Sequence, residues 1–388
     1  MMFRSSLPLV AALSVALAMV GVSRAAAQLF ETKAAQAYMI DAETGTVLFS
    51  KDADAPIQPA SLAKLMTLEV TFNAVKSGRL KLDDTFVVSE HAWRTGGAPS
   101  GTSTMFAALK STIRLEDLIQ GVAVQAANDG CIVIAEGMAG SEQNFALQMT
   151  ERAHQIGLTA STFVNATGLP ADGQQTTVRD LTNLALHLWR DYPDLYHYFG
   201  QKDFLWNKIR QQNRNPLLST DSGGDGLAVG ASEQNGFGIV GSIAKDGKRV
   251  IAAMSGLAND RERAEEARKL MEWGLRSFEK TEIFAKDEVV GEAEVFGGEK
   301  SGVALKAKGP VDIFLPITNR DKMTARIVYN GPLPAPVEEG QQVGALKVWI
   351  GDTLSQETPL YAAETIGVGS LPRRALDAAE ELAVGWLR

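Results

Sequence analysis

The chain has few of the residues that bind soft metals or cross-link exported proteins. Its 388 residues include one cysteine, Cys131, and four scattered histidines. A single cysteine excludes an intramolecular disulfide, and no dense cluster of nitrogen and sulfur ligands is available for a zinc-type site. We therefore expect neither a metal nor an organic cofactor, and stability must come from ordinary hydrophobic cores.

Concentrated positive charge is also missing. The formal net charge is −8, and the sequence contains no dense cluster of lysine and arginine. Nucleic-acid binding depends mainly on cations that neutralise phosphates, so we expect no nucleic-acid partner.

Long hydrophobic runs are scarce, and the strongest one lies at the N-terminus. Arg4 precedes an apolar run over residues 7–22, and three small residues follow at 25–27. The run is shorter than the about 20 residues that a membrane-spanning helix needs. A basic start, an apolar centre and a small-residue exit are typical of a cleaved secretory signal. We therefore predict a signal peptide over 1–27 and export of the remaining chain.

Two regions with different predicted secondary structure follow this segment. A hairpin pattern at 37–52 and a strand pair at 236–256 are interspersed with helical periodicities at 61–78, 115–124, 144–157, 178–192 and 260–280. Short alternating runs with glycine and proline then predict a small all-β domain over 284–366. Residues 370–388 predict a last helix.

Ser61 and Lys64 stand three residues apart at the start of a helical pattern, so they share one face of the helix. A hydroxyl is a weak nucleophile until a base removes its proton. Lysine can be that base where burial and neighbouring dipoles keep its amine neutral. The pair thus fits a nucleophile and a base without histidine, although the spacing alone is common by chance.

The motifs around Ser61 and Lys64 indicate that the spacing of this pair is not accidental. Residues 34–67 resemble the start of the D-alanyl-D-alanine carboxypeptidases, the low-molecular-mass penicillin-binding proteins, in which a hairpin precedes P-A-S-x-x-K-[LM]-M-T. Further similar stretches follow in family order at 89–97, 116–130, 163–170, 210–218 and 335–344. The resemblance implies an α+β fold, with a penicillin-binding or β-lactamase-like transpeptidase domain over 28–280. In that domain an antiparallel sheet carries helices on both sides, and the all-β domain follows.

The resemblance also implies roles for individual residues. Ser61 matches the acyl-ester nucleophile, and Lys64 matches the base that activates it. The second family motif, S-x-N, falls on 126–128, where Asn128 is retained to hold the substrate backbone. Ala126 replaces the serine that helps to relay a proton to the leaving amine.

The third family motif, K-T-G, falls on 228–230. Gly230 is retained and permits close approach of the substrate to the backbone. Ala228 replaces a lysine that helps to bind the substrate carboxylate, and Val229 replaces a hydroxyl. Ser232 offers a hydroxyl where the family commonly has threonine.

Several functional interpretations follow from this resemblance. The first is a periplasmic serine-type D-Ala-D-Ala carboxypeptidase that acts on peptidoglycan stem peptides and is covalently inhibited by β-lactams. The substitutions at 126, 228 and 229 keep open a catalytically impaired paralogue that binds peptidoglycan or a partner. A serine β-lactamase is disfavoured, because those enzymes use a glutamate to activate water and none occurs between Arg152 and Leu227.

The final helical stretch, 370–388, is similar to the amphipathic tails of family members that lie on the membrane surface. It balances three arginines against three acidic residues beside a modest apolar face. Peripheral contact with the inner membrane and simple packing are both compatible with this pattern.

Overall fold

A computed structural model describes residues 30–219, 223–318 and 323–384 of the chain. The predicted signal peptide lies outside the described residues, as do the last four residues of the predicted C-terminal helix.

The first part of the chain is built around one five-stranded antiparallel sheet. The strand order is β2-β1-β9-β8-β7. The bounds are Gln36–Asp41 for β1, Val47–Lys51 for β2, Gly224–Ser232 for β7, Gly236–Lys245 for β8 and Lys248–Leu257 for β9. The predicted hairpin is β1 and β2, and β1 also pairs with β9. Strand β7 lies at the edge of the sheet, and among the described strands it pairs with β8 alone.

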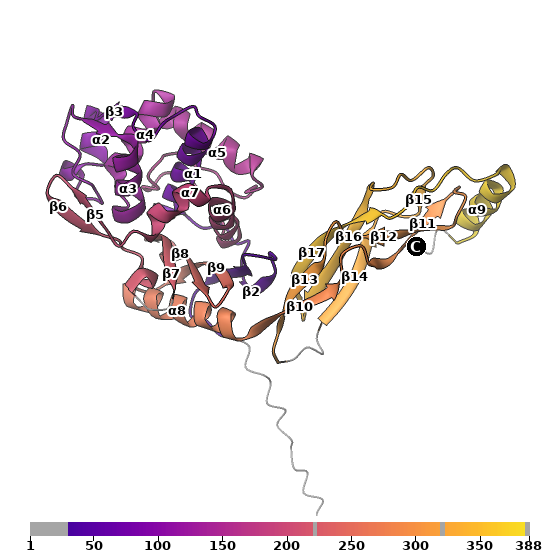
Figure 1. The fold of residues 1–388 in the computed structure, drawn as a ribbon. Coiled ribbons are helices and arrows are strands. Elements are labelled where there is room, and N and C mark those ends of the chain that lie inside the picture. Colours follow the sequence, from indigo (N-terminus) through magenta and orange to yellow (C-terminus); the bar gives the residue numbers. More distant parts are fainter. Residues whose placement is uncertain (1–29, 220–222, 319–322, 385–388) are drawn as a thin grey trace, which may run out of the picture. The chain divides into compact units, whose positions relative to one another are not determined.

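Helices cover both faces of this sheet (Figure 1). They are α1 Lys64–Lys76, α2 Glu90–Thr95, α3 Leu115–Gln125, α4 Asn128–Ala139, α5 Glu142–Gln155, α6 Val178–Asp191, α7 Pro193–Tyr196 and α8 Asp260–Arg276. Figure 1 shows α8 on one face and α6 on the other, with α2 to α5 further from the sheet on the side of α6. Two small hairpins accompany the helices, β3 Thr85–Val87 with β4 Thr112–Arg114 and β5 Asp203–Trp206 with β6 Ile209–Gln212. The predicted α+β architecture is confirmed.

Local sequence signals explain where several helices begin. Ser89, Ser141, Thr177 and Asn259 each accept a hydrogen bond from the backbone N–H three residues further on, which is the usual role of an N-cap side chain. The helix expected over 260–280 ends earlier, at Arg276. The chain turns there into a strand that begins at Phe278, whose buried ring packs edge-to-face on Trp273 at 4.9 Å.

Helix α1 forms the centre of the helical layer. Side chains on every side of it are buried, among them Leu65, Met66 and Thr67. A helix that is buried all round is held by packing on all its faces. The 3₁₀ turn Ala60–Ala63 that leads into α1, and contains Ser61, is therefore attached to a rigid element.

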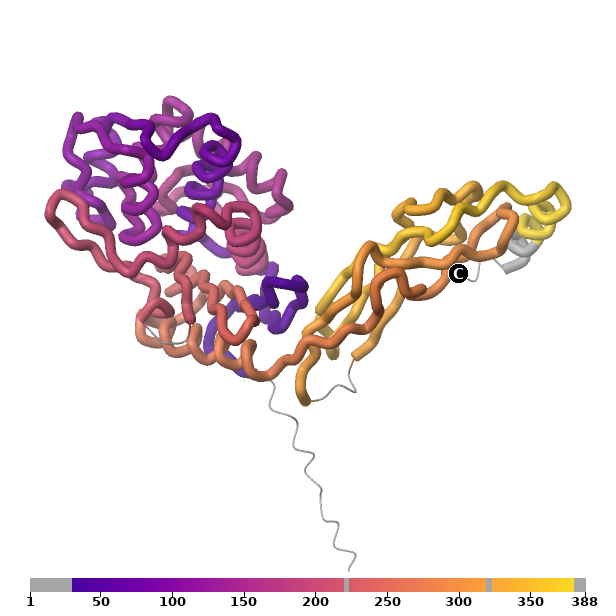
Figure 2. The backbone as a smooth tube through the Cα atoms, viewed as in Figure 1, coloured from indigo at the N-terminus to yellow at the C-terminus, as the bar shows by residue number. Residues whose placement is uncertain are grey.

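The second part of the chain forms strands with a core of their own (Figure 2, orange to yellow). The bounds are β10 Phe278–Phe284, β11 Val289–Phe296, β12 Gly302–Lys306, β13 Val311–Pro316, β14 Met323–Tyr329, β15 Leu333–Pro334, β16 Gln342–Ile350 and β17 Thr353–Ala362. Six of them form a sheet in the order β14-β16-β17-β12-β11-β15, and β10 pairs with β13. The predicted all-β character is confirmed.

Helix α9, Leu371–Val384, follows these strands and corresponds to the predicted terminal helix. Within the described ranges, no helix has the length and apolar content to cross a bilayer.

Candidate active site

Ser61 lies in a tight turn directly before helix α1. The residue before it, Ala60, has φ of 46°, in the left-handed region that non-glycine residues rarely adopt. Gly168 fits closely against the same turn, because a Cβ on Gly168 would lie 1.7 Å from the Ala60 carbonyl oxygen. The turn that presents Ser61 is therefore strained and is held by a second segment of the chain.

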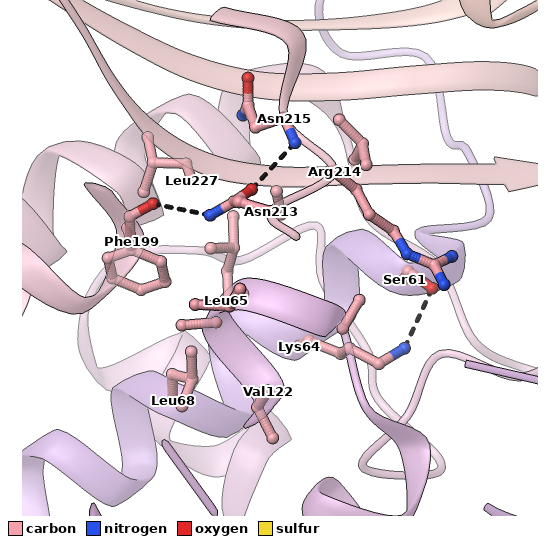
Figure 3. Close-up of a pocket in the computed structure, with 15 residues that line it drawn as sticks. Ser61, Lys64, Leu65, Leu68, Val122, Phe199, Asn213, Arg214, Asn215 and Leu227 are labelled. Atoms are coloured by element: carbon pink, nitrogen blue, oxygen red, sulfur yellow. Dashed lines mark hydrogen bonds between the residues drawn. The ribbon is translucent and has the colours of Figure 1, made fainter. Parts of the chain in front are cut away.

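Lys64 is the buried partner of Ser61 (Figure 3). Its Nζ lies 3.0 Å from Ser61 Oγ and 2.5 Å from the Thr167 carbonyl oxygen. Loss of hydration lowers the pKa of Lys64 to about 8, with a further lowering from the charge of Arg214, while Cys131 acts in the opposite direction. About one tenth of the amines are then neutral at pH 7, far more than for an exposed lysine.

The segment that holds Lys64 is the turn at 165–168. Asn165 Oδ1 accepts hydrogen bonds from the backbone N–H groups of Thr167 and Gly168, and Thr67 Oγ1 donates to the Ala166 carbonyl. These bonds orient the Thr167 carbonyl toward the amine. Sequence reasoning did not assign this contact, because a backbone carbonyl leaves no side-chain signal.

The second motif lies where α3 ends and α4 begins. Ala126 caps the C-terminal end of α3 with φ of 57°, and Asn128 is the first residue of α4. Asn128 Nδ2 donates to Thr102 Oγ1 at 2.9 Å, while its Oδ1 is buried without a protein partner among the described residues. Ala126 lines the same cavities as Ser61, so the chain lacks a hydroxyl at a position that faces the nucleophile.

The third motif lies on the edge strand β7, beside the nucleophile turn. A Cβ on Gly230 would lie 3.1 Å from the Ser61 nitrogen, so the two backbones approach closely. Ala228 and Val229 line a small cavity of about 20 Å³ with Ser61 and Lys64. Ser232 lies further along, at the β7–β8 turn, where its hydroxyl accepts a hydrogen bond from the Asn235 backbone at 3.0 Å.

A larger cavity of about 540 Å³ opens beside Ser61. Ser103, Ala126 and Gly230 line it, together with two guanidinium groups, Arg214 and Arg263. The structure thus brings Ser61, Lys64 and positions 126 and 228–230 together. In the ranges that the structure covers, no group of three histidine, cysteine, aspartate or glutamate side chains is arranged to hold a metal ion.

The two cations come from segments to which sequence reasoning gave no role. Arg214 extends from the loop after β6 toward Ser61 (Figure 3), and its neighbour Asn215 anchors that loop by donating to the Gly226 carbonyl at 2.9 Å. Arg263 comes from α8, where its guanidinium pairs with Asp260 at 2.5 Å and only 9% of the side chain is exposed. The asparagines that flank Arg214 were the available signal, since buried loops need side chains that satisfy backbone groups.

A serine beside a buried lysine, at the edge of an antiparallel sheet between helices, is the arrangement shared by penicillin-binding proteins and serine β-lactamases. The chain belongs to the D-alanyl-D-alanine carboxypeptidase family, whose model matches residues 22–258. A second model, the C-terminal domain of penicillin-binding protein 5, matches residues 278–367.

Matches to individual relatives extend over most of this chain and most of each relative. The D-alanyl-D-alanine carboxypeptidase DacC of Escherichia coli is 35% identical over 87% of this chain and 86% of its own length. DacD of Salmonella typhimurium is 32% identical over 87% and 88%. The crystal structure of penicillin-binding protein 5 from Haemophilus influenzae aligns with a TM-score of 0.74 and 29% identity, over 88% of this chain and 99% of that one.

Proposed function

We propose that the protein is a serine-type D-Ala-D-Ala carboxypeptidase that trims peptidoglycan stem peptides through an acyl-enzyme on Ser61. The observation that carries this proposal is the 3.0 Å contact between Ser61 Oγ and the buried Lys64 amine, whose pKa is lowered to about 8. Membership of the carboxypeptidase family supports the choice of substrate.

The proposed reaction begins with removal of the Ser61 proton by the neutral Lys64 amine. Ser61 Oγ then attacks the carbonyl of the penultimate D-alanine, the bond to the terminal D-alanine breaks, and water later hydrolyses the ester. The close backbone of Gly230 allows the peptide to lie along the edge of β7. Asn128, at the start of α4, is the proposed amide contact for the substrate backbone.

The terminal carboxylate of the peptide needs a cation, and position 228 lacks one. Arg214 and Arg263 both line the cavity that Ser61 faces. A guanidinium binds a carboxylate through two parallel hydrogen bonds, which a single ammonium cannot provide. We assign the carboxylate to this arginine pair, and this is the feature that favours retained turnover despite Ala228.

β-Lactams are the proposed covalent inhibitors. A penicillin-binding protein D2 from Listeria monocytogenes, 26% identical over 64% of this chain, has been solved in cefotaxime-bound form with a TM-score of 0.58. The decisive experiment is mass spectrometry of the intact protein after incubation with penicillin. An adduct on the native protein that is absent from Ser61→Ala supports the proposal, and labelling that persists in Ser61→Ala overturns the assignment of the nucleophile.

The second candidate function is an impaired paralogue that binds peptidoglycan without cleaving it. The aliphatic side chains at 126, 228 and 229 favour it, because a lost relay costs about 10²–10⁴ in rate. Release of D-alanine from a D-Ala-D-Ala peptide separates the two candidates. Retained cell-wall binding without any released D-alanine would favour the impaired paralogue.

We further propose that the chain is exported to the periplasm and contacts the inner membrane peripherally through α9. The basic, apolar and small-residue order at the N-terminus supports export. Leu371 and Leu376 of α9 are exposed, which supports an apolar contact with lipid headgroups and acyl chains. Liposome binding with and without residues 370–388 tests the contact, and equal partitioning of the two forms would refute it.

A further inference from the structure

Cleavage of an amide needs a proton for the departing nitrogen as well as a base for the nucleophile. Lys64 holds the proton that it takes from Ser61, and its amine is fixed between Ser61 Oγ and the Thr167 carbonyl. A group that can accept one proton and donate another must therefore lie on the substrate side of Ser61. A hydroxyl has both capacities, and position 126 has no hydroxyl.

Few side chains that line the cavity can accept one proton and donate another. Its aliphatic and aromatic side chains carry no transferable proton, and guanidinium groups do not deprotonate in proteins. The Asp260 carboxylate is paired with Arg263 at 2.5 Å and is a poor donor when ionised. Among the described residues that line the cavity, Ser103 supplies the hydroxyl other than that of Ser61.

The loop that carries Ser103 is bonded to the second motif. The Ser103 carbonyl accepts from the Asn128 backbone N–H at 2.8 Å, and Thr102 Oγ1 accepts from Asn128 Nδ2 at 2.9 Å. On the other side, the buried Asp129 carboxylate accepts from Thr104 Oγ1 at 2.5 Å and from the Met105 backbone at 3.0 Å. These bonds hold the loop on both sides of Ser103 to the first two residues of α4. The first of them, Asn128, lies two residues after Ala126 in the sequence.

We propose that the Ser103 hydroxyl returns the proton to the leaving D-alanine amine, in place of the hydroxyl that Ala126 lacks. The proposal rests on the acyl-transfer function proposed for Ser61. As the C–N bond breaks, its electron pair stays on nitrogen, which takes the proton of Ser103 Oγ. Ser103 Oγ takes the proton that Lys64 received from Ser61. Ser103 and Lys64 end the step unchanged, and the products are acyl-Ser61 and free D-alanine.

Comparing two leaving groups distinguishes a proton-transfer role for Ser103 from a purely structural role. A structural role would affect both substrates equally. Ser103→Ala should lower kcat/KM for a D-Ala-D-Ala peptide by about 10²-fold or more. A thioester analogue, whose thiolate leaves without a proton, should be affected by less than about threefold. Normal thioester turnover in Ser103→Ala also shows that the variant is folded.

Two further variants sharpen the experiment. The double variant Ser103→Ala with Ala126→Ser should recover peptide turnover, because it restores a hydroxyl at the neighbouring position. Ser111→Ala is the matched control, since Ser111 lies further along the same connecting segment and donates to the Ala108 carbonyl at 2.7 Å. Its peptide and thioester rates should both stay at wild-type levels.

The outcomes separate the relay from the function on which it rests. Unchanged peptide turnover in Ser103→Ala, or equal losses on both substrates, would overturn the relay. So would a wild-type protein that turns over the thioester but releases no D-alanine from the peptide, although Ser61 would remain the nucleophile. A wild-type protein that forms no acyl adduct at all would overturn the function itself, and the relay with it.

Discussion

The Thr167 carbonyl accepts a 2.5 Å hydrogen bond from Lys64 Nζ, although 103 residues separate the two positions in the chain. When the amine is neutral, donating one N–H to this carbonyl leaves its lone pair free to face the Ser61 hydroxyl. The same turn packs Gly168 against Ala60. The backbone at 165–168 therefore orients the base and supports the nucleophile at once.

We expect Gly168→Ala to abolish acylation by penicillin. Its Cβ would lie 1.7 Å from the Ala60 carbonyl oxygen, so the turn before Ser61 must move. Gly173→Ala is the matched control, because Gly173 has a similar left-handed φ of 82° but its nearest neighbouring atom would be 3.9 Å away. The control should lose about 1–2 kcal/mol of stability, the cost of a left-handed alanine, and should still be labelled. Mass spectrometry of penicillin adducts checks both variants, and normal labelling of Gly168→Ala would contradict the expectation.

The rate of acylation should rise with pH through about 8 and then level off. Only the neutral form of Lys64 can take the Ser61 proton, and the lowered pKa of this amine places the transition near 8. Stopped-flow acylation by a chromogenic β-lactam at saturating concentration, from pH 6 to 10, measures the profile. A flat profile over this range would show that Lys64 is not the base.

Removing the Arg214 cation should move this profile to higher pH. The charge of Arg214 lowers the pKa of Lys64, so Arg214→Gln should leave less neutral amine at pH 7 and slow acylation severalfold there. At saturating β-lactam, where weaker carboxylate binding no longer limits the rate, the difference should vanish at pH 10, because both proteins then carry a neutral base. Arg261→Gln is the control, since the Arg261 side chain is 88% exposed and pairs with Glu265. A shift of equal size in the control would point to net charge rather than to Arg214.

The sequence was sufficient for the fold and for the Ser61–Lys64 pair, because both depend on local patterns and ordered motifs. It was insufficient for Arg214, Arg263 and Ser103, which reach the cavity from three separate segments through tertiary packing. The alanine at position 228 shows that strand β7 lacks the cation that the family motif has there. Whether another segment supplies the missing charge depends on distances that spacing along the chain does not encode.

Restoring the third motif measures how much the arginine pair compensates. Ala228→Lys with Val229→Thr should raise kcat/KM for the peptide by about tenfold, near the lower end of what one charge-assisted hydrogen bond contributes. Ala244→Lys adds the same charge to β8 outside the residues that line the cavity, and it should change nothing. Activity that appears only in the restored variant would instead identify the native chain as the impaired paralogue.

The last prediction concerns stability, and it rests on a buried charge in α1. Glu69 Oε1 accepts hydrogen bonds from Arg152 Nε at 3.0 Å, His187 Nε2 at 3.1 Å and the Tyr192 hydroxyl at 2.8 Å, and its side chain has no exposed surface. Glu69→Ala should lower the free energy of unfolding by about 3–5 kcal/mol, because Arg152 would keep a partly buried charge without its partner.

Urea unfolding of Glu69→Ala beside Glu151→Ala measures this effect. Glu151 lies exposed on α5, where its carboxylate contacts only Gln155 among the hydrogen bonds of the described residues, so its removal should cost less than about 1 kcal/mol. Because α1 begins at Lys64, the weakened Glu69 variant should also acylate more slowly near its unfolding midpoint. If both variants unfold at the same urea concentration, the network around Glu69 does not stabilise the helix that carries the base.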